Sequence, residues 1–578
     1  MASGIRKYIP ILEWLPAYKR SSLKGDLIAG LTVGIMLIPQ GMAYAMIAGV
    51  PPIYGLYAAI IPIIMYAIFG TSRQLAVGPV AMISLLVAAG VSSIPNIDAD
   101  TYLLLAITLS LLVGIIQFSL GALRLGFLVN FLSHPVISGF TSAAALIIGL
   151  SQLKHLLGIP VPGSSQIHLI VIGVAREIGE LSWLTLLIGL GGMALVIGVR
   201  KVNKSIPGPL IAVLFGILLV YFAGLNEQGV AIVGEVPDGL PAFSLPIFDW
   251  QIWKTLMPTA LTIAMVSFME SISVGKAIQN KHRGEYEIDA NQELIALGMA
   301  NMGGSFFQAY PVDGGFSRTA VNDQAGAHTG LASIISASLI AITLLFLTPL
   351  FYYLPNAILA SIIMVAVVGL MDWKEAKSLW KHDRKDFYMM LFTFLTTLIF
   401  GIVEGILTGM VLSLALVIYK SAYPHVAVLG RIPGTSFYRN VKRFAEAETK
   451  DGVLVLRFDA PLYFANADYF KDQVRQMEEK AQTPVRLLIL NAESIVGVDS
   501  SAVRMLRQLV EEGRERGRDF ALAGAIGPVR DILFKNGLMD MIGKDHVFPH
   551  VHEAVEQLTG EGCSDQSKRL AWQVGVDG

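Results

Sequence analysis

The two stretches that decide the fold are LAVGPVA at residues 75–81 and YPVDGGFSR at residues 310–318. Each places glycine and proline within or beside an apolar segment, and the second adds the carboxylate of Asp313 and the guanidinium of Arg318. Apolar segments that are broken at corresponding places of two halves are typical of the central binding site of a transporter. The arginine indicates that the cargo is an anion.

The composition predicts a polytopic membrane protein. Of the 578 residues, 54% are hydrophobic and only 15% are charged, with a mean hydropathy of +0.60. A soluble domain usually carries about 25% charged residues. Runs such as 103–120 and 331–350 contain no charge and are long enough to cross a bilayer. The formal net charge of −1 gives no indication of nucleic-acid binding.

Fourteen apolar segments are expected as membrane spans, two of them short. They are 27–47, 53–69, 80–91, 102–121, 127–150, 181–199, 207–224, 255–275, 290–306, 316–325, 330–351, 355–371, 386–401 and 403–420. The acidic loop around 225–254 separates seven segments from seven, so the broken third segment corresponds to the broken tenth. Because an odd number of spans gives the two halves opposite orientations, this arrangement predicts an inverted repeat.

The loop charges predict the orientation. If the N-terminus is inside, the inner loops carry cations such as Arg73, Arg124 and Lys276, whereas outer loops carry anions such as Asp98 and Asp100. This bias predicts a multi-pass protein of the inner (plasma) membrane with both termini in the cytoplasm. No cleavable signal pattern is found, so the first span is expected to direct insertion.

The expected domains are a cytosolic N-terminal segment (1–25), a transmembrane transport domain (26–424), a small α/β domain (438–560) and a polar tail (561–578). In the third of these, predicted strands such as 453–458 alternate with predicted helices such as 500–514, the latter capped by Asp499. No Walker A loop, metal-ligand cluster or nucleophilic triad is found there. We therefore expect no enzyme activity and no cofactor.

Arg318 is the sharpest single indication of a site. A charge inside a spanning segment is costly, and it usually lines a cavity or meets a partner. Arg318 follows Gly314 and Gly315, where a half-helix could begin and present free N–H groups to an anion. The alternative is that Arg318 pairs with Asp313 or Glu270 and only holds the bundle together.

Four further residues bear on the same site. Val80 and Ala81 follow Gly78-Pro79 and mark a second possible helix start, although Gly-Pro kinks are also common in membrane helices. Gln40 and Tyr44 lie four residues apart on one helical face, where they either donate hydrogen bonds to the cargo or join two helices.

Glu270 is the predicted coupling residue. A lone carboxylate within a span is a default candidate for proton or cation coupling. The alternative is a permanent salt bridge with Arg318, and a switchable ion pair would unite the two interpretations.

Several longer motifs resemble the sulfate permease (SulP) family, the bacterial relatives of solute carrier family 26. They are DLIAGLTVG at 26–34, PQGMAYA at 39–45, PPIYGLY at 51–57, ESIS at 270–273 and FSRTAVN at 316–322. The C-terminal part resembles a STAS domain, the sulfate-transporter and anti-sigma-antagonist module. The resemblance covers nearly the whole chain.

The resemblance implies a fold, a site and a mechanism. The fold is a seven-plus-seven inverted repeat with a core and a gate domain, and the mechanism is elevator-like alternating access in a homodimer. The site would lie between the third and tenth segments and, by motif match, would be lined by Gln40, Tyr44, Ala81, Ser317 and Arg318. With the neighbouring Val80 and Phe316, these are the predicted substrate-binding residues. Glu270 matches the family's coupling carboxylate. Asp313 departs from the family, which often has threonine there, and could bind Na⁺ or share a proton with Glu270.

The leading hypothesis is a secondary active importer that takes up sulfate with protons across the lipid bilayer. A Na⁺-dependent bicarbonate symporter is the alternative that Asp313 favours, with Na⁺ held at Asp313 and Glu270. A C4-dicarboxylate transporter is also open, because carboxylates and oxyanions require similar donors. An anion channel and a membrane-anchored anion sensor are the other classes considered. No metal other than this Na⁺ and no nucleic acid is expected as a partner.

Overall fold

Each of the fourteen predicted apolar segments corresponds to a helix. The computed structural model describes residues 8–95, 97–127, 133–161, 166–202, 207–235, 237, 239–282, 286–368 and 371–560. The fourteen helices are α3 (Leu23–Ala48), α5 (Ile61–Phe69), α6 (Ala81–Ser92), α7 (Ala99–Ala122), α8 (His134–Ser151), α11 (Trp183–Val202), α12 (Gly208–Ala223), α13 (Trp250–Gln279), α14 (Ala290–Ser305), α15 (Phe316–Gln324), α16 (Leu331–Phe346), α17 (Asn356–Val368), α19 (Arg384–Phe400) and α20 (Ile402–Ala422). The predicted tail at 561–578 and residues 1–7 lie outside the described residues.

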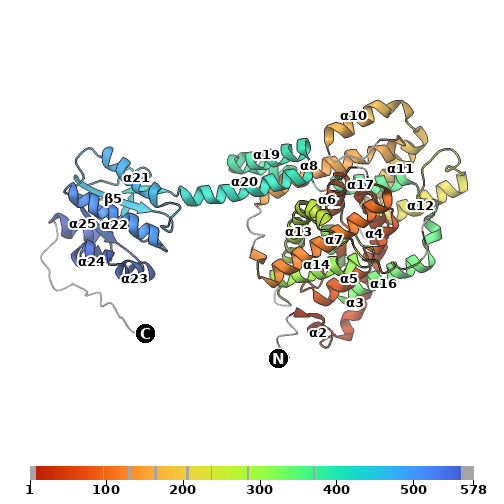
Figure 1. Cartoon of the computed structure of the whole chain (residues 1–578), viewed down its shortest axis with the longest axis horizontal. Helices are drawn as coiled ribbons and strands as arrows, with labels where there is room; N and C mark the ends of the chain where they lie inside the picture. Colours follow the sequence, from red (N-terminus) through yellow and green to blue (C-terminus); the bar gives the residue numbers. More distant parts are fainter. Residues whose placement is uncertain are drawn as a thin grey trace. The chain divides into compact units, whose positions relative to one another are not determined.

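The other described helices of this part of the chain connect these elements. They are α2 (Ile11–Trp14), η1 (Arg20–Ser22), α4 (Ile53–Tyr57), α9 (Leu153–Leu157), α10 (Ile167–Glu177), η3 (Ile178–Glu180), η4 (Thr348–Phe351) and α18 (Trp373–His382). The chain divides into two compact units, Met1–Leu414 and Ala415–Gly578, and the helices and strands are coloured along the sequence in Figure 1.

Six described helical stretches are long and apolar enough, by length and composition, to cross a membrane. They are Arg20–Ala48, Ala99–Ala122, His134–Leu157, Trp250–Gln279, Asn356–His382 and Val403–Ala422. The helices α6 and α15 are much shorter, with 12 and 9 residues. Both begin directly after the two glycine- and proline-containing stretches, because those stretches interrupt the helix in the middle of an apolar segment.

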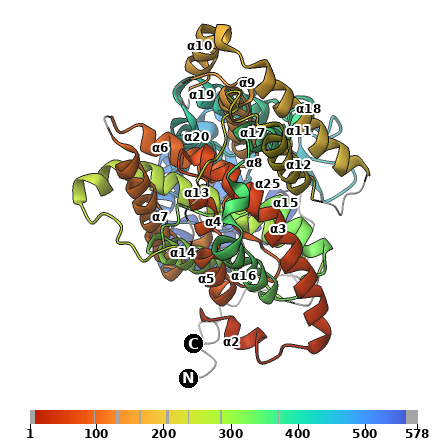
Figure 2. The ribbon, with the colours of Figure 1, turned by 90° about the vertical axis from the view of Figure 1, so that its right-hand side faces the viewer.

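The helices of the first unit form two groups. One group contains α3 to α7 and α13 to α16, and the other contains α8 to α12 and α17 to α19, with the first half of α20 packed against α8 and α19. Figure 2 shows α7 beside α14 and α3 beside α16 in the first group, and Figure 1 shows α19 beside α8 in the second.

Helix contacts occur in equivalent pairs: when each helix is replaced by the helix at the same position in the other half of the sequence, one contact becomes the other. The contact of α3 with α16 has its counterpart in α13 with α7, and the contact of α3 with α6 has its counterpart in α13 with α15. Likewise, α8 packs against α19 as α17 packs against α11. Two sequence halves of seven helices therefore make equivalent contacts, as an inverted repeat requires.

Two buried carboxylates hold the turns that lead into and out of the broken segments. Glu293 on α14 accepts hydrogen bonds from the backbone N–H of Thr71 at 2.7 Å and of Ser72 at 3.1 Å. Asp26 on α3 accepts from the backbone N–H of His328 at 2.7 Å and of Thr329 at 3.0 Å. A carboxylate that accepts several N–H bonds satisfies donors that would otherwise be buried without partners.

The second unit is built on a six-stranded sheet in the order β4-β3-β5-β6-β7-β8. The strands are β3 (Val426–Arg431), β4 (Tyr438–Asn440), β5 (Val453–Phe458), β6 (Leu487–Asn491), β7 (Asp519–Ala523) and β8 (Val547–Phe548). Strands β5 to β8 are parallel, whereas β3 runs antiparallel to both β4 and β5. All five residues of β6 are buried, as expected for a central parallel strand.

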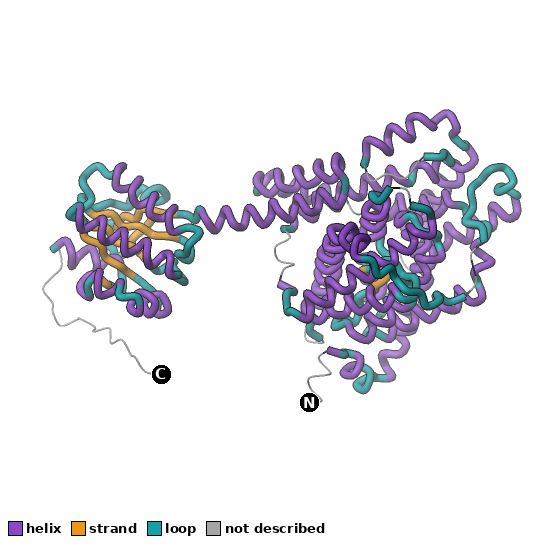
Figure 3. Tube along the Cα trace, viewed as in Figure 1, coloured by secondary structure: helices purple, strands orange, loops and turns teal. Residues whose placement is uncertain are grey.

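Helices cover both faces of this sheet, as Figure 3 shows with the strands in orange. On one face lie α21 (Ala467–Glu479) and α22 (Ser500–Glu515), and on the other lies α25 (Val551–Thr559). The chain between β7 and β8 forms α23 (Gly527–Lys535), α24 (Leu538–Ile542) and η5 (Lys544–His546). The prediction that Asp499 caps α22 is confirmed, because its side chain accepts from the N–H of Ala502 at 2.8 Å.

The sheet begins before the predicted start of this domain. Strand β3 lies at 426–431, N-terminal to the expected boundary at 438, and it pairs with both β4 and β5. Strand β3 is not predicted from the sequence, because it follows the last apolar helix after only a short turn. The domain limits themselves stay a prediction.

Candidate functional site

The two broken segments meet at a short antiparallel ladder. Strand β1 (Val77–Gly78) pairs with β2 (Asp313–Gly314), with Val77 opposite Gly314 and Gly78 opposite Asp313. The N–H of Gly315 adds a hydrogen bond of 3.0 Å to the carbonyl of Ala76. This ladder is the short orange segment within the helical unit in Figure 3. The structure thus brings together two stretches that lie more than two hundred residues apart in the sequence.

A half-helix leaves each strand. Helix α6 starts at Ala81 with Val80 as its N-cap residue, and α15 starts at Phe316 with Gly315 as its N-cap residue. Neither N-cap side chain makes a capping hydrogen bond. Both helix starts therefore retain first-turn N–H groups that no N-cap side chain occupies, together with the positive end of the helix dipole.

Glycines make this approach possible. Gly78 has a φ of 148°, which side-chain-bearing residues rarely adopt. A Cβ atom at Gly314 would lie 2.6 Å from Oγ of Ser271, and one at Gly315 would lie 2.8 Å from Cζ of Arg318. Side chains at these two positions would displace the groups that line the site.

Arg318 ties the two helix starts together. Its side chain is buried, with 2% of the residue exposed. Nη1 donates to the carbonyl of Pro79 at 2.6 Å, and Nη2 donates weakly to the carbonyl of Ala76 at 3.5 Å. Nε has no hydrogen-bond partner, and no carboxylate of the described residues lies within 4 Å of the guanidinium. The alternative in which Arg318 forms an ion pair with Asp313 or Glu270 is not realised in this conformation.

One face of α15 binds the chain that leads into α6. Thr319 accepts a hydrogen bond from the N–H of Ala76 at 3.0 Å, and Asn322 donates to the carbonyl of Gln74 at 2.9 Å. The sequence analysis did not assign roles to these two residues. Their spacing relative to Arg318 could have revealed them, because positions 318, 319 and 322 lie on one helical face.

Asp313 is fully buried beside α13. Its Oδ1 accepts hydrogen bonds from the hydroxyl of Ser267 at 2.9 Å and from that of Ser271, while its Oδ2 has no partner. Ser271 in turn accepts from the N–H of Gly314 at 3.0 Å. An unpartnered carboxylate oxygen in the interior is costly, so this atom is available to a proton or a cation.

A polar network anchors β2 behind Asp313. Ser267 accepts from Nε2 of Gln117 at 3.0 Å, and Gln117 accepts from Nδ2 of Asn301 at 3.0 Å. Asn301 then accepts from the N–H of Val312 at 2.8 Å. The network joins α7, α13 and α14 to the strand, so the position of Asp313 is determined by three helices.

Glu270 lies on α13 between the two serines that bind Asp313. It is partly exposed, and it interacts electrostatically with both Arg318 and Asp313. Two carboxylates that share one site cannot both carry a charge without mutual repulsion. The predicted coupling pair is therefore adjacent in the structure and lies next to the predicted anion site.

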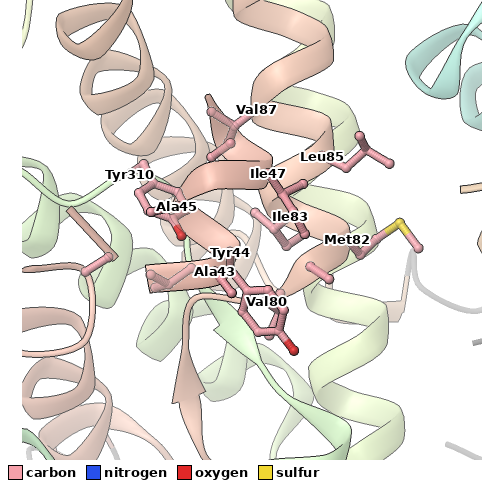
Figure 4. Close-up of a cluster of buried hydrophobic side chains, with 14 of the residues drawn as sticks. Ala43, Tyr44, Ala45, Ile47, Val80, Met82, Ile83, Leu85, Val87 and Tyr310 are labelled. Carbon is pink, nitrogen blue, oxygen red and sulfur yellow. The ribbon is translucent and has the colours of Figure 1, made fainter. Parts of the chain in front are cut away.

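The remaining predicted residues divide into buried and exposed groups. Gln40 and Tyr44 of α3 are each 7% exposed, and Oε1 of Gln40 has no partner. Figure 4 shows Tyr44 with Val80 at the start of α6, and α3 packs against both α6 and α15. Phe316 is 60% exposed, and Ser317 is also exposed, so the first turn of α15 has an open side.

Comparison with known proteins identifies the family. The sulfate permease family model matches residues 23–393, and the STAS domain model matches residues 444–554. The chain belongs to the sulfate permease family. As a member of a family of permeases, it is a multi-pass membrane transport protein and not an enzyme. The predicted family and fold class are confirmed, while the count of fourteen crossings stays a prediction.

Individual relatives cover almost the whole chain. The chloroplastic sulfate transporter 4.1 of Arabidopsis thaliana is 43% identical over 96% of this chain and 83% of that relative. The probable sulfate transporter 4.2 of the same plant is also 43% identical, over 95% of this chain and 83% of that relative. The solved structure of the murine Slc26a9 anion transporter in the inward-facing state has a TM-score of 0.90 at 27% identity, covering 97% of this chain and 95% of that one.

Gly315→Ala tests the geometry of the site. Gly315 has ordinary extended backbone angles, so alanine causes no backbone strain, but its Cβ would meet the guanidinium at 2.8 Å. We expect Arg318 to leave the Pro79 carbonyl and anion uptake into proteoliposomes to fall by about tenfold or more, the loss expected when one charged hydrogen bond is broken. The matched control is Gly149→Ala, where the nearest atoms lie 3.8 Å away. Equal uptake by both variants would contradict the proposed position of Arg318.

Proposed function

We propose that this protein is a secondary active anion transporter that takes up sulfate together with protons by elevator-like alternating access. The observation that carries the proposal is the meeting of the α6 and α15 starts around a buried Arg318 that has no carboxylate partner within 4 Å. The names of the sulfate transporters that the chain resembles support sulfate as the substrate.

The site suits a tetrahedral oxyanion. Helices α6 and α15 begin within three residues of the paired strands β1 and β2, and helix N-termini bind anions through their first-turn N–H groups. Arg318 supplies a guanidinium whose Nε is still without a partner. Because the first turn of α15 is exposed at Phe316 and Ser317, an anion can reach these donors. Tyr44 and Gln40 add side-chain polar groups from α3.

The two carboxylates account for the coupling. When Glu270 and Asp313 are both ionised, they outweigh the single charge of Arg318, and the site repels a dianion. Protonation of either carboxylate removes this excess negative charge, and protonation of both leaves the guanidinium charge uncompensated. Sulfate and protons therefore favour each other's binding, which is the thermodynamic requirement for symport.

The two helix groups provide the moving parts. All the elements that build the site, namely α3, α6, α13 and α15, belong to the first group. We propose that this group moves as a body against the second group and exposes the site alternately on the two sides. A site carried on one rigid group keeps its geometry during such a movement.

Na⁺-dependent bicarbonate symport is the second candidate. It is favoured by the unpartnered Oδ2 of Asp313, which lies next to the hydroxyls of Ser267 and Ser271. Hard cations prefer such oxygen ligands. Replacing Na⁺ by K⁺ at constant pH should leave sulfate uptake unchanged if protons are the coupling ion. Bicarbonate uptake that disappears on this replacement would instead establish the second candidate.

We further propose a homodimer in the plasma membrane with both termini in the cytoplasm. The excess of cations in the inner loops, including Arg73, Arg124 and Lys276, supports this orientation, whereas the homodimer is what the family resemblance implies. Cys563 is the one cysteine of the chain, so it reports the side of the C-terminus. A membrane-impermeant maleimide should label it only after the cells are permeabilised. Labelling of intact cells would show that the C-terminus lies outside and would contradict the proposed orientation.

Glu270→Gln tests the proton coupling, because glutamine keeps the shape of the side chain but cannot exchange a proton. An inward gradient of one pH unit provides about 1.4 kcal/mol per proton, enough for about tenfold accumulation. We expect the wild type to show this stimulation of labelled sulfate uptake in proteoliposomes and the variant to lose it. Glu404→Gln is the control, because Glu404 is exposed on α20 outside the site. Persistence of the stimulation in Glu270→Gln would refute the assignment.

A further inference from the structure

The second unit, Ala415–Gly578, contains the STAS domain and is called the STAS unit below. It contains an open pocket that the transport function does not use. Its volume is about 490 Å³, which lies within the range of small-ligand sites. The residues that matter for its chemistry are His425, Arg439, Arg443, Phe444, Arg457 and Asp459. They come from the chain before β3, from β4 and the turn after it, and from β5 and its end, so one edge of the sheet builds the pocket.

The single carboxylate of the pocket is already engaged. Arg457 donates to Asp459 through Nε at 2.6 Å and through Nη2 at 3.0 Å, and Nδ1 of His425 lies 2.8 Å from Oδ2. Partial burial raises the pKa of this carboxyl, but the hydrogen bonds from Arg457 and His425 outweigh burial and hold the pKa of Asp459 below its ordinary value. Asp459 therefore stays ionised and neutralises Arg457.

Two guanidinium groups remain without a carboxylate. Among the described residues, neither Arg439 nor Arg443 has an ion-pair partner within 4 Å. Arg439 lies over the ring of Phe437, with Cζ 5.7 Å from the ring centroid, and this contact orients its side chain. The pocket thus presents two uncompensated positive charges beside the exposed aromatic ring of Phe444.

The pocket also lies close, along the chain, to the end of an apolar helix. His425 follows Ala422, the last residue of α20, by three residues. Three residues span at most about 10 Å when fully extended. The pocket therefore begins, along the chain, soon after a candidate membrane span, and basic residues that follow a span can attract the headgroups of anionic lipids.

We propose that this pocket binds a phosphate group, supplied either by the headgroup of an anionic phospholipid or by a soluble phosphate ester. Arg439 and Arg443 contact the phosphate oxygens, because guanidinium groups match phosphate in charge and in hydrogen-bond geometry. The hydrogen-bonded side chains of Arg457, Asp459 and His425 form one side of the pocket, where the charges of Arg457 and Asp459 cancel. The ring of Phe444 packs against the apolar part of the ligand. The STAS domain is then a ligand-binding module in addition to any structural role.

The experiment compares three forms of the full-length protein in detergent. They are the wild type, Arg439→Gln with Arg443→Gln, and the control Arg504→Gln with Arg516→Gln, which removes the same charge from two exposed arginines of α22 and its end. Native mass spectrometry measures binding of phosphatidic acid in one arm and of glycerol 3-phosphate in the other. Phosphatidylcholine is the control lipid, and its binding measures lipid adducts that form without a net negative charge on the headgroup.

We expect the pocket variant to bind its ligand at least about tenfold more weakly than the control, because each charged hydrogen bond is worth a factor of about ten or more. If the pocket variant binds only phosphatidic acid more weakly, the phosphate group comes from a lipid headgroup. If it also binds glycerol 3-phosphate more weakly, the pocket accepts a soluble phosphate ester. Equal binding of both probes by the two variants would overturn the proposal. Because the transport residues are unchanged, sulfate uptake by the pocket variant also verifies that it is folded.

Discussion

The hydrogen bond from Arg318 to the carbonyl of Pro79 is the interaction on which the site depends. It joins the first turn of α15 to the residues just before α6, and the β1–β2 ladder holds the same two segments in register. Without these contacts, two interrupted backbones would leave unpaired N–H and C=O groups inside an apolar protein, which is very costly there. The interruption is tolerated because each broken segment supplies partners for the other.

The same arrangement fits the proposed anion site, because it places one guanidinium beside two helix starts without a large fixed charge. Arg318 donates its hydrogen bonds to backbone carbonyls and not to a carboxylate. Its charge is therefore compensated only by the longer-range interaction with the nearby Glu270 and Asp313. The protonation of these two acids then decides the sign of the local charge. A site in which one cation and two acids compete responds to protons far more than a site built from helix dipoles alone.

The two units use arginine in contrasting ways. In the helical unit, Arg318 is buried and its position is determined by backbone carbonyls, since a mobile charge would be too costly there. In the STAS unit, Arg457 is neutralised by Asp459, whereas Arg439 and Arg443 remain exposed to water, where an unpaired guanidinium costs little. Both proposed sites contain guanidinium groups without a carboxylate partner within 4 Å, but only the first needs a surrounding protein network to hold the charge in the interior.

The sequence by itself determined the family, the order of the apolar segments along the chain, and the two stretches that interrupt them. These features are local, because hydropathy over about twenty residues and the placement of glycine and proline decide where a membrane helix starts and stops. It also singled out Arg318, Glu270 and Asp313, since charges at membrane depth are rare.

Only the tertiary structure decided what these residues contact. The pairing of Val77 with Gly314, the roles of Thr319 and Asn322, and the binding of Asp313 by Ser267 and Ser271 all join segments that are distant in the sequence. Whether Arg318 contacts a carboxylate or the Pro79 carbonyl likewise depends on how closely the neighbouring helices bring these groups to the guanidinium. Periodicity and composition carry no information about such distances, because they arise from how helices pack against one another and not from the preferences of any one segment.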